Sequence, residues 1–126
     1  MSQRTLLIVF HSRTGGAEHM ARAAQAGALQ EAGVDVRLLP ATQAQVAARP
    51  YACMVCAGSD GAGAARQIAR IATGWRLHAV AEPLIVCTHA QSPEAIAAPK
   101  HLSCTELAAC RDLGHALATG LALGIF

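Results

Sequence analysis

Two hydroxyl residues and two glycines follow the first apolar segment of the chain, in the run Ser12-Arg13-Thr14-Gly15-Gly16. The segment before them predicts a strand and the segment after them a helix. Such a turn presents unpaired backbone N–H groups and the positive end of the helix dipole to an anion. We therefore expect a phosphate site on the N–H groups of residues 14–17, which include Ala17. An ordinary strand-to-helix turn is the alternative, because such turns also contain glycines and hydroxyls.

A second glycine-rich turn consists of Gly58, Ser59, Asp60 and Gly61 and follows the apolar segment 51–57. Two interpretations are open. The turn could contribute to a ligand site at the carboxyl ends of the strands, or it could be a connection in which Ser59 or Asp60 caps the next helix.

Histidine and cysteine residues, which often act in catalysis or bind metals, give weaker indications of function. His11 and His89 each follow a predicted strand at its carboxyl end and are candidates to line a ligand crevice, whereas the histidine spacing predicts no metal site. The five cysteines are an odd set and are expected to be thiols; Cys53 and Cys56 would point to opposite faces of a strand. We assign no catalytic side chain.

The elements that position these turns alternate between strands and helices. Strands are expected in residues 6–10, 34–39, 51–57 and between 76 and 88. Helices are expected over 16–32, where Met20, Ala24 and Ala28 form one stripe, over 62–73, and from Ser103 onward, where Ser103 and Glu106 have the spacing of a capping box. Residues 91–101 contain two prolines and are expected to form a loop. This alternation predicts a parallel α/β sheet.

Composition sets the broad class. The 126 residues are 53% hydrophobic and 14% charged, which predicts one domain spanning 1–126 with a well-covered core. The net charge of +2 is spread along the chain, so nucleic acid is not an expected partner. The apolar segments are too short for a membrane span or a signal peptide, and we expect a cytoplasmic protein.

The run from Leu7 to Gly16 resembles the opening of flavodoxins and their NAD(P)H-dependent FMN quinone oxidoreductase relatives, whose phosphate loop follows a T/S-x-T-G-x-T pattern. Ser12, Thr14 and Gly15 match this pattern, whereas Ala17 stands where a last hydroxyl is usual. The resemblance implies that Ser12, Arg13, Thr14, Gly15, Gly16 and Ala17 bind the phosphate of FMN. It also implies that Gly58, Ser59, Asp60 and Gly61 lie beside the flavin ring.

One unit of that family is missing between the second and third predicted strands, where only residues 40–50 are present. The expected fold is a flavodoxin-like, doubly wound parallel sheet of four strands in the order 2-1-3-4, within a three-layer sandwich. Because the short connection cannot supply a helix, part of one sheet face should be bare. We expect a homodimer that covers it and weaker FMN binding than in full-length relatives.

Two functions from different classes follow from the resemblance. The first is an FMN-dependent oxidoreductase or electron carrier, of the quinone or flavin reductase type if it is an enzyme, with a nicotinamide nucleotide or another small molecule as redox partner. The second is a shortened, non-catalytic anion-binding or interaction module that keeps the phosphate loop. A dinucleotide site of the G-x-G-x-x-G type is disfavoured, because that motif is absent after the first strand.

Overall fold

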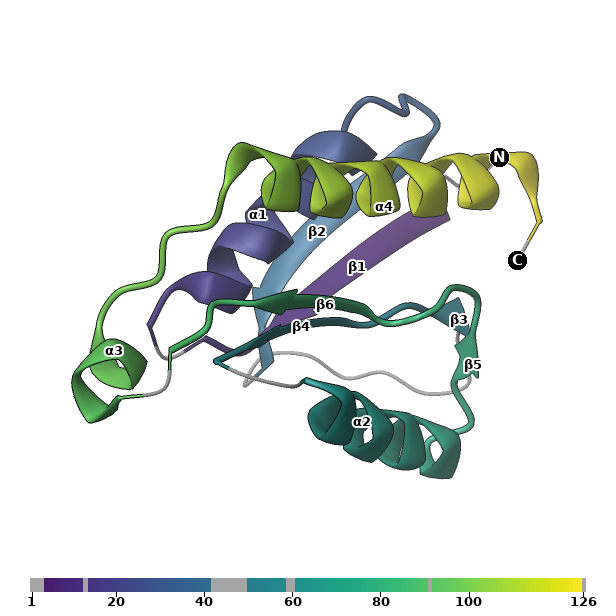
Figure 1. The fold of residues 1–126 in the computed structure, drawn as a ribbon. Helices are drawn as coiled ribbons and strands as arrows, with labels where there is room; N and C mark the ends of the chain where they lie inside the picture. The colour runs from purple at the N-terminus through teal and green to yellow at the C-terminus, as the bar shows by residue number, and fades with distance from the viewer. Residues whose placement is uncertain (1–3, 13, 42–49, 59–60, 91, 126) are drawn as a thin grey trace. The chain divides into compact units, whose positions relative to one another are not determined.

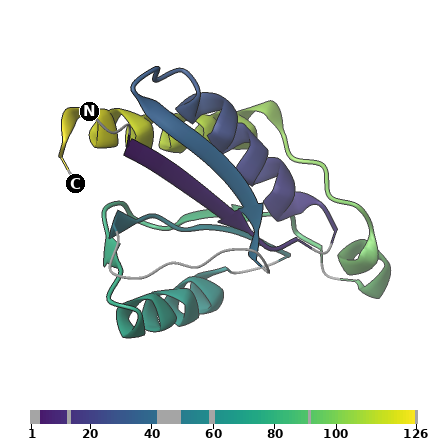
Figure 2. The ribbon, with the colours of Figure 1, turned by 180° about the vertical axis from the view of Figure 1, so that it is seen from behind.

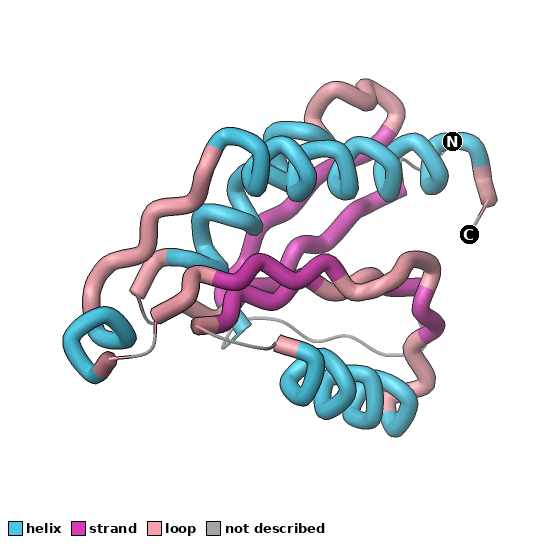
Figure 3. The backbone as a smooth tube through the Cα atoms, in the orientation of Figure 1, coloured by secondary structure: helices cyan, strands magenta, loops and turns pink. Residues whose placement is uncertain are grey.

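The computed structural model describes residues 4–12, 14–41, 50–58, 61–90 and 92–125. These residues form a mixed α/β structure of short parallel strand pairs and helices (Figures 1 and 3). They divide into two compact units: unit 1 contains Met1–Ala44 and His101–Phe126, and unit 2 contains Gln45–Lys100. In chain order the elements are β1 (Arg4–Phe10), α1 (Gly16–Ala28), β2 (Val34–Pro40), β3 (Pro50–Tyr51), β4 (Met54–Ala57), α2 (Ala62–Gly74), β5 (His78–Ala79), β6 (Leu84–Cys87), α3 (Pro93–Ala97) and α4 (Cys104–Leu123).

Unit 1 is a β1–α1–β2 crossover with α4 added to it. The two strands are parallel and pair without interruption from Arg4 opposite Val34 to Phe10 opposite Pro40. Helices α1 and α4 both lie on one face of this strand pair, and Figure 2 shows the opposite face of the pair. Ala28 and Ala118, both fully buried, pack with Val34 at the centre. This core confirms the helical stripe expected around Ala28.

The strands of unit 2 form two parallel pairs, β3 with β5 and β4 with β6. Tyr51 pairs with Ala79, and Met54 pairs with Leu84. The segment that joins β5 to β6 therefore has two more residues between these pairs than the segment that joins β3 to β4. Pro83, which has no N–H to donate, lies in that longer stretch. The mismatch breaks both expected strands, 51–57 and the one between 76 and 88, into two pieces. Strand pairing among the described residues gives three two-stranded sheets, β1–β2, β3–β5 and β4–β6, and does not establish the expected four-stranded order 2-1-3-4.

Three expected boundaries differ from the structure. Helix α1 ends at Ala28 rather than at residue 32, because the chain turns there, with Glu31 N–H donating to the Ala28 carbonyl at 3.1 Å. Helix α2 extends to Gly74, whereas the expected helix ends at residue 73. Arg76, which follows this helix, has a left-handed backbone with φ 62°. The stretch 91–101 contains the short helix α3, which Ser92 caps by accepting a hydrogen bond from Ala95 N–H at 3.1 Å.

Other sequence-based expectations are confirmed. Ser103 and Glu106 form both hydrogen bonds of the capping box at the start of α4. All five cysteines lie in the described part of the chain, and they are thiols. No helix within that part is both long enough and apolar enough to cross a membrane.

Candidate phosphate site

The phosphate loop, residues 12–17, joins β1 to α1 within unit 1. Gly15 stands at the start of α1 with φ +95°, a left-handed conformation that residues with a Cβ rarely adopt. A Cβ placed there would lie 3.5 Å from the His19 ring, which is an ordinary contact. The glycine is therefore required by the direction of the backbone and not by lack of space.

The Ser12 hydroxyl fixes this turn. Its oxygen accepts a hydrogen bond from Gly15 N–H at 3.0 Å, and the Gly15 carbonyl accepts from His19 N–H at 2.9 Å in the first turn of α1. A serine hydroxyl that accepts one bond still has its own proton to donate. Ser12 can therefore hold the loop and donate to an anion at the same time.

The helices differ in how their amino ends are satisfied. Helices α3 and α4 are capped by the side chains of Ser92 and Ser103. Helices α1 and α2 have glycines at the capping position, Gly15 and Gly61, and within the described residues neither helix has a side-chain cap. Uncapped N–H groups at a helix start are suited to bind an anion. Among the described residues, the two helices without a side-chain cap are the two that follow the predicted ligand loops.

Charged side chains modify the field at the start of α1. Glu18 lies in the first turn, where its negative charge competes with any bound anion. Arg22 pairs with it at a nitrogen-to-oxygen distance of 3.5 Å, and the side chains of Arg22 and Glu18 are 60% and 44% exposed. The pair offsets part of the carboxylate charge, though only weakly at an exposed site. Arg13, the charged residue among those expected to bind phosphate, lies outside the described residues.

The second predicted loop, residues 58–61, lies in unit 2, and its glycines have packing roles. A Cβ on Gly61 would lie 2.6 Å from Ile85 Cγ2, and a Cβ on Gly58 would lie 2.6 Å from the Ala90 carbonyl oxygen. Close approach to neighbouring segments therefore accounts for both glycines without a ligand. Ser59 and Asp60 lie outside the described residues, so both interpretations of this loop stay open.

The sequence analysis missed a side-chain pair at the end of β6. Cys87 Sγ lies 3.6 Å from Nδ1 of His89, whose side chain is exposed. His11 is exposed directly after β1. In the sequence, this pair is visible only as a histidine two positions after a strand-ending cysteine. That spacing is not specific enough to indicate a site.

No protein-family model matches the chain, and no curated protein matches it. Within the part of the chain that the structure describes, no group of three or more histidine, cysteine, aspartate or glutamate side chains is placed to hold a metal ion. The geometry of the phosphate loop is therefore the main guide to function.

Proposed function

We propose that this chain is a flavodoxin-like FMN-binding protein that acts as an oxidoreductase or electron carrier. The proposal depends chiefly on one observation: the turn after β1 has a left-handed glycine and a fixed serine hydroxyl at the uncapped start of α1. This combination suits a phosphate. The ligand residues proposed there are Ser12, Arg13, Thr14, Gly15, Gly16 and Ala17.

The proposal includes a finer description of the fold. The parallel pairs β1–β2 and β4–β6 are compatible with one doubly wound sheet in the order 2-1-3-4, counted by the expected strands. In such a sheet, ligands bind beyond the carboxyl ends of the strands. The phosphate loop follows β1 and residues 58–61 follow β4, so in the proposed sheet each would stand where a ligand loop belongs.

The residues of the phosphate loop fit the phosphate end of FMN better than residues 58–61 fit the ring. The loop offers backbone donors and hydroxyls, whereas residues 57–61 contain no aromatic side chain to stack on a flavin. When bound, FMN would supply the redox chemistry through its ring. A nicotinamide nucleotide or another small redox molecule would be its partner, and the chain would contribute binding and orientation.

A flavin titration tests the proposal. The purified chain, mixed with FMN, should quench flavin fluorescence in a saturable way, and a nicotinamide nucleotide should then bleach the bound flavin. Riboflavin, which has the same ring without the phosphate, is the matched control and should bind much more weakly. Equal binding of FMN and riboflavin, or no saturation by FMN, would contradict the proposal.

A second candidate function is a shortened anion-binding module without redox activity. The packing roles of Gly58 and Gly61 favour it, because they leave the second loop explained without a flavin ring. This module would bind inorganic phosphate or pyrophosphate at the phosphate loop and would not distinguish FMN from other phosphate esters. Competition between pyrophosphate and FMN separates the two functions. Pyrophosphate should displace FMN readily if the chain is such a module, and only in large excess if the chain also binds the flavin ring.

We further propose that the chain forms homodimers through exposed apolar side chains. On α2, Ile68, Ile71 and Trp75 form one helical stripe and are 39%, 48% and 54% exposed. Such a stripe favours association, because burial of apolar area stabilises a complex.

A further inference from the structure

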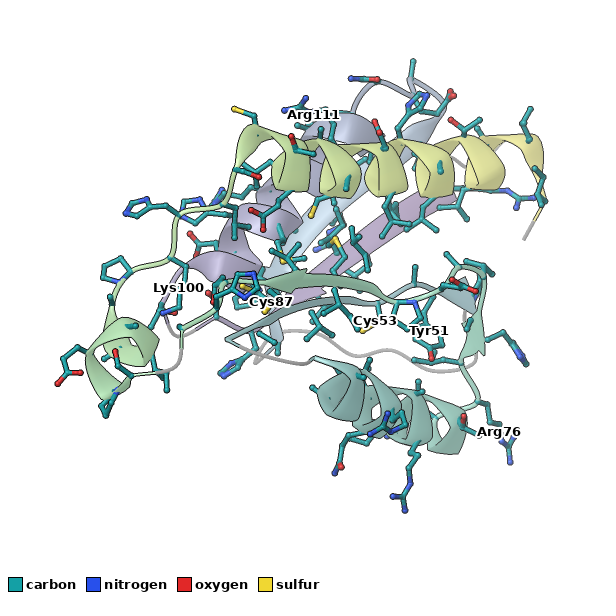
Figure 4. All side chains as sticks on the ribbon, viewed as in Figure 1. Tyr51, Cys53, Arg76, Cys87, Lys100 and Arg111 are labelled. Atoms are coloured by element: carbon teal, nitrogen blue, oxygen red, sulfur yellow. The ribbon has the colours of Figure 1, made fainter. Side chains whose placement is uncertain are left out.

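A cysteine and a histidine meet at the carboxyl end of β6 in unit 2. Cys87 is the last residue of β6, and its Sγ lies 3.6 Å from Nδ1 of His89 (Figure 4 labels Cys87). This distance is within the range of a hydrogen bond to sulfur. A neutral imidazole nitrogen in that place can accept the thiol proton.

The segment between the two side chains is held firmly against β4. Thr88 donates twice to the Ala57 carbonyl oxygen, from its N–H at 2.8 Å and from its hydroxyl at 3.2 Å. On the far side of His89, the Ala90 carbonyl packs so closely on Gly58 that no side chain would fit between them. The backbone on both sides of His89 is thus fixed by contacts within unit 2.

His89 itself has an unusual backbone. Its φ of 57° is left-handed, which among the described residues other than glycine is shared with Arg76 alone. This conformation is uncommon for a residue with a Cβ and persists where surrounding contacts enforce it. Here the enforcing contacts are those of Thr88 and Ala90. They hold the imidazole beside the sulfur.

Accessibility differs among the thiols of the chain. Cys87 is partly exposed and His89 is exposed, so a small molecule in solution can reach the pair. In contrast, Cys110 is fully buried, and burial raises the pKa of the Cys53 thiol, which disfavours its thiolate. Cys104 is exposed at the first turn of α4 and serves as an internal reference.

We propose that Cys87 and His89 form a reactive thiol–imidazole pair that exchanges with low-molecular-weight disulfides. His89 Nδ1 takes the thiol proton, and the Cys87 sulfur attacks one sulfur of the disulfide. A new bond forms between Cys87 and that sulfur while the original disulfide bond breaks. The departing thiolate takes the proton back from the imidazolium, so one disulfide and one thiol give a mixed disulfide and a new thiol. The reaction needs no flavin and does not depend on the proposed function.

Site-resolved kinetics with glutathione disulfide test the proposal on the full chain. Mixed-disulfide formation at Cys87 and Cys104 is followed in the same sample by peptide mass spectrometry. In His89→Asn, which tolerates the left-handed backbone, the rate at Cys87 should fall by about tenfold or more while Cys104 is unchanged. An unchanged rate at Cys87 would overturn the proposal.

A second variant separates proton transfer from structural damage. His89→Gly also accepts a left-handed φ and removes the ring. Added imidazole should restore the Cys87 rate toward that of the native chain, and N-methylation of both ring nitrogens, as in dimethylimidazolium, should abolish this rescue. If imidazole and dimethylimidazolium leave the Cys87 rate equally low, the pair does not act by proton transfer and the proposal is wrong.

Discussion

Gly27 of α1 and Gly114 of α4 lie where the two helix backbones come into direct contact. A Cβ on Gly27 would lie 1.8 Å from the carbonyl oxygen of Arg111, and a Cβ on Gly114 would lie 1.9 Å from that of Ala24. Neither distance is possible between non-bonded atoms. The two glycines therefore set the spacing between α1 and α4 in unit 1.

Because the two backbones touch, even the smallest substitution, glycine to alanine, is predicted to destabilise the protein strongly. Gly114→Ala should lower the free energy of unfolding by about 3 kcal/mol, because the added methyl meets backbone atoms that cannot turn aside. Urea denaturation followed by circular dichroism measures the change. Gly74→Ala is the control: a Cβ there has nothing within 4 Å, and the substitution should raise stability by about 0.5 kcal/mol. Similar effects of both variants would contradict the packing argument.

The phosphate loop predicts that backbone geometry matters more than side-chain charge. Gly15→Val places a branched side chain at φ +95° and should reduce FMN binding far more than Arg13→Ala. Fluorescence titration of both variants gives the comparison. Equal losses would mean that the charge of Arg13, and not the turn, holds the phosphate.

Removing the carboxylate at the start of α1 should improve anion binding. Glu18→Gln eliminates a negative charge from the first turn and leaves Arg22 without its carboxylate partner. We expect FMN to bind about two- to fivefold more tightly at low ionic strength, with less difference at high salt. Asp35→Asn removes an equal charge near the opposite end of the β1–β2 pair and should have no effect. Unchanged affinity in Glu18→Gln at low salt would place the anion away from α1.

If the chain forms homodimers, light scattering should detect the dimer, and a substitution in the interface should dissociate it. Light scattering should give about twice the monomer mass of 13.0 kDa. Ile71→Asp, in the middle of the exposed α2 stripe, should shift the protein to monomers, because a buried unpaired carboxylate opposes association. Leu29→Asp, at a site on unit 1 that is 61% exposed, should leave the dimer intact. A monomeric native chain would exclude this interface.

Local patterns in the sequence predicted part of the fold well. The run before Ser12, the helical stripe of Met20 and Ala28, and the capping box of Ser103 are each determined by residues close together in the chain. The breaks in the unit 2 strands were not predictable in this way, since they arise from a two-residue mismatch between partners about thirty positions apart. The pairing of Cys87 with His89 likewise depends on contacts of Thr88 with Ala57 and of Ala90 with Gly58.

Some glycines of the candidate site illustrate the same limit. The sequence shows Gly15 and Gly61 as equivalent residues before helices, yet they act differently. Gly15 supplies a left-handed turn, whereas Gly61 makes room for Ile85. Only the three-dimensional structure separates a glycine needed for backbone direction from one needed for packing.

Unit 1 is assembled from two segments that are far apart in the chain, and this affects folding during synthesis. The stripe of α1, with Met20 and Ala28 buried, is made early, but its partner α4 lies after all of unit 2. On the ribosome, β1, α1 and β2 must wait with an uncovered apolar helix face until residues 101–126 have emerged. Unit 2, whose segments are contiguous, has no such delay. The nascent chain is therefore expected to depend on chaperone protection of α1, and to complete unit 1 last.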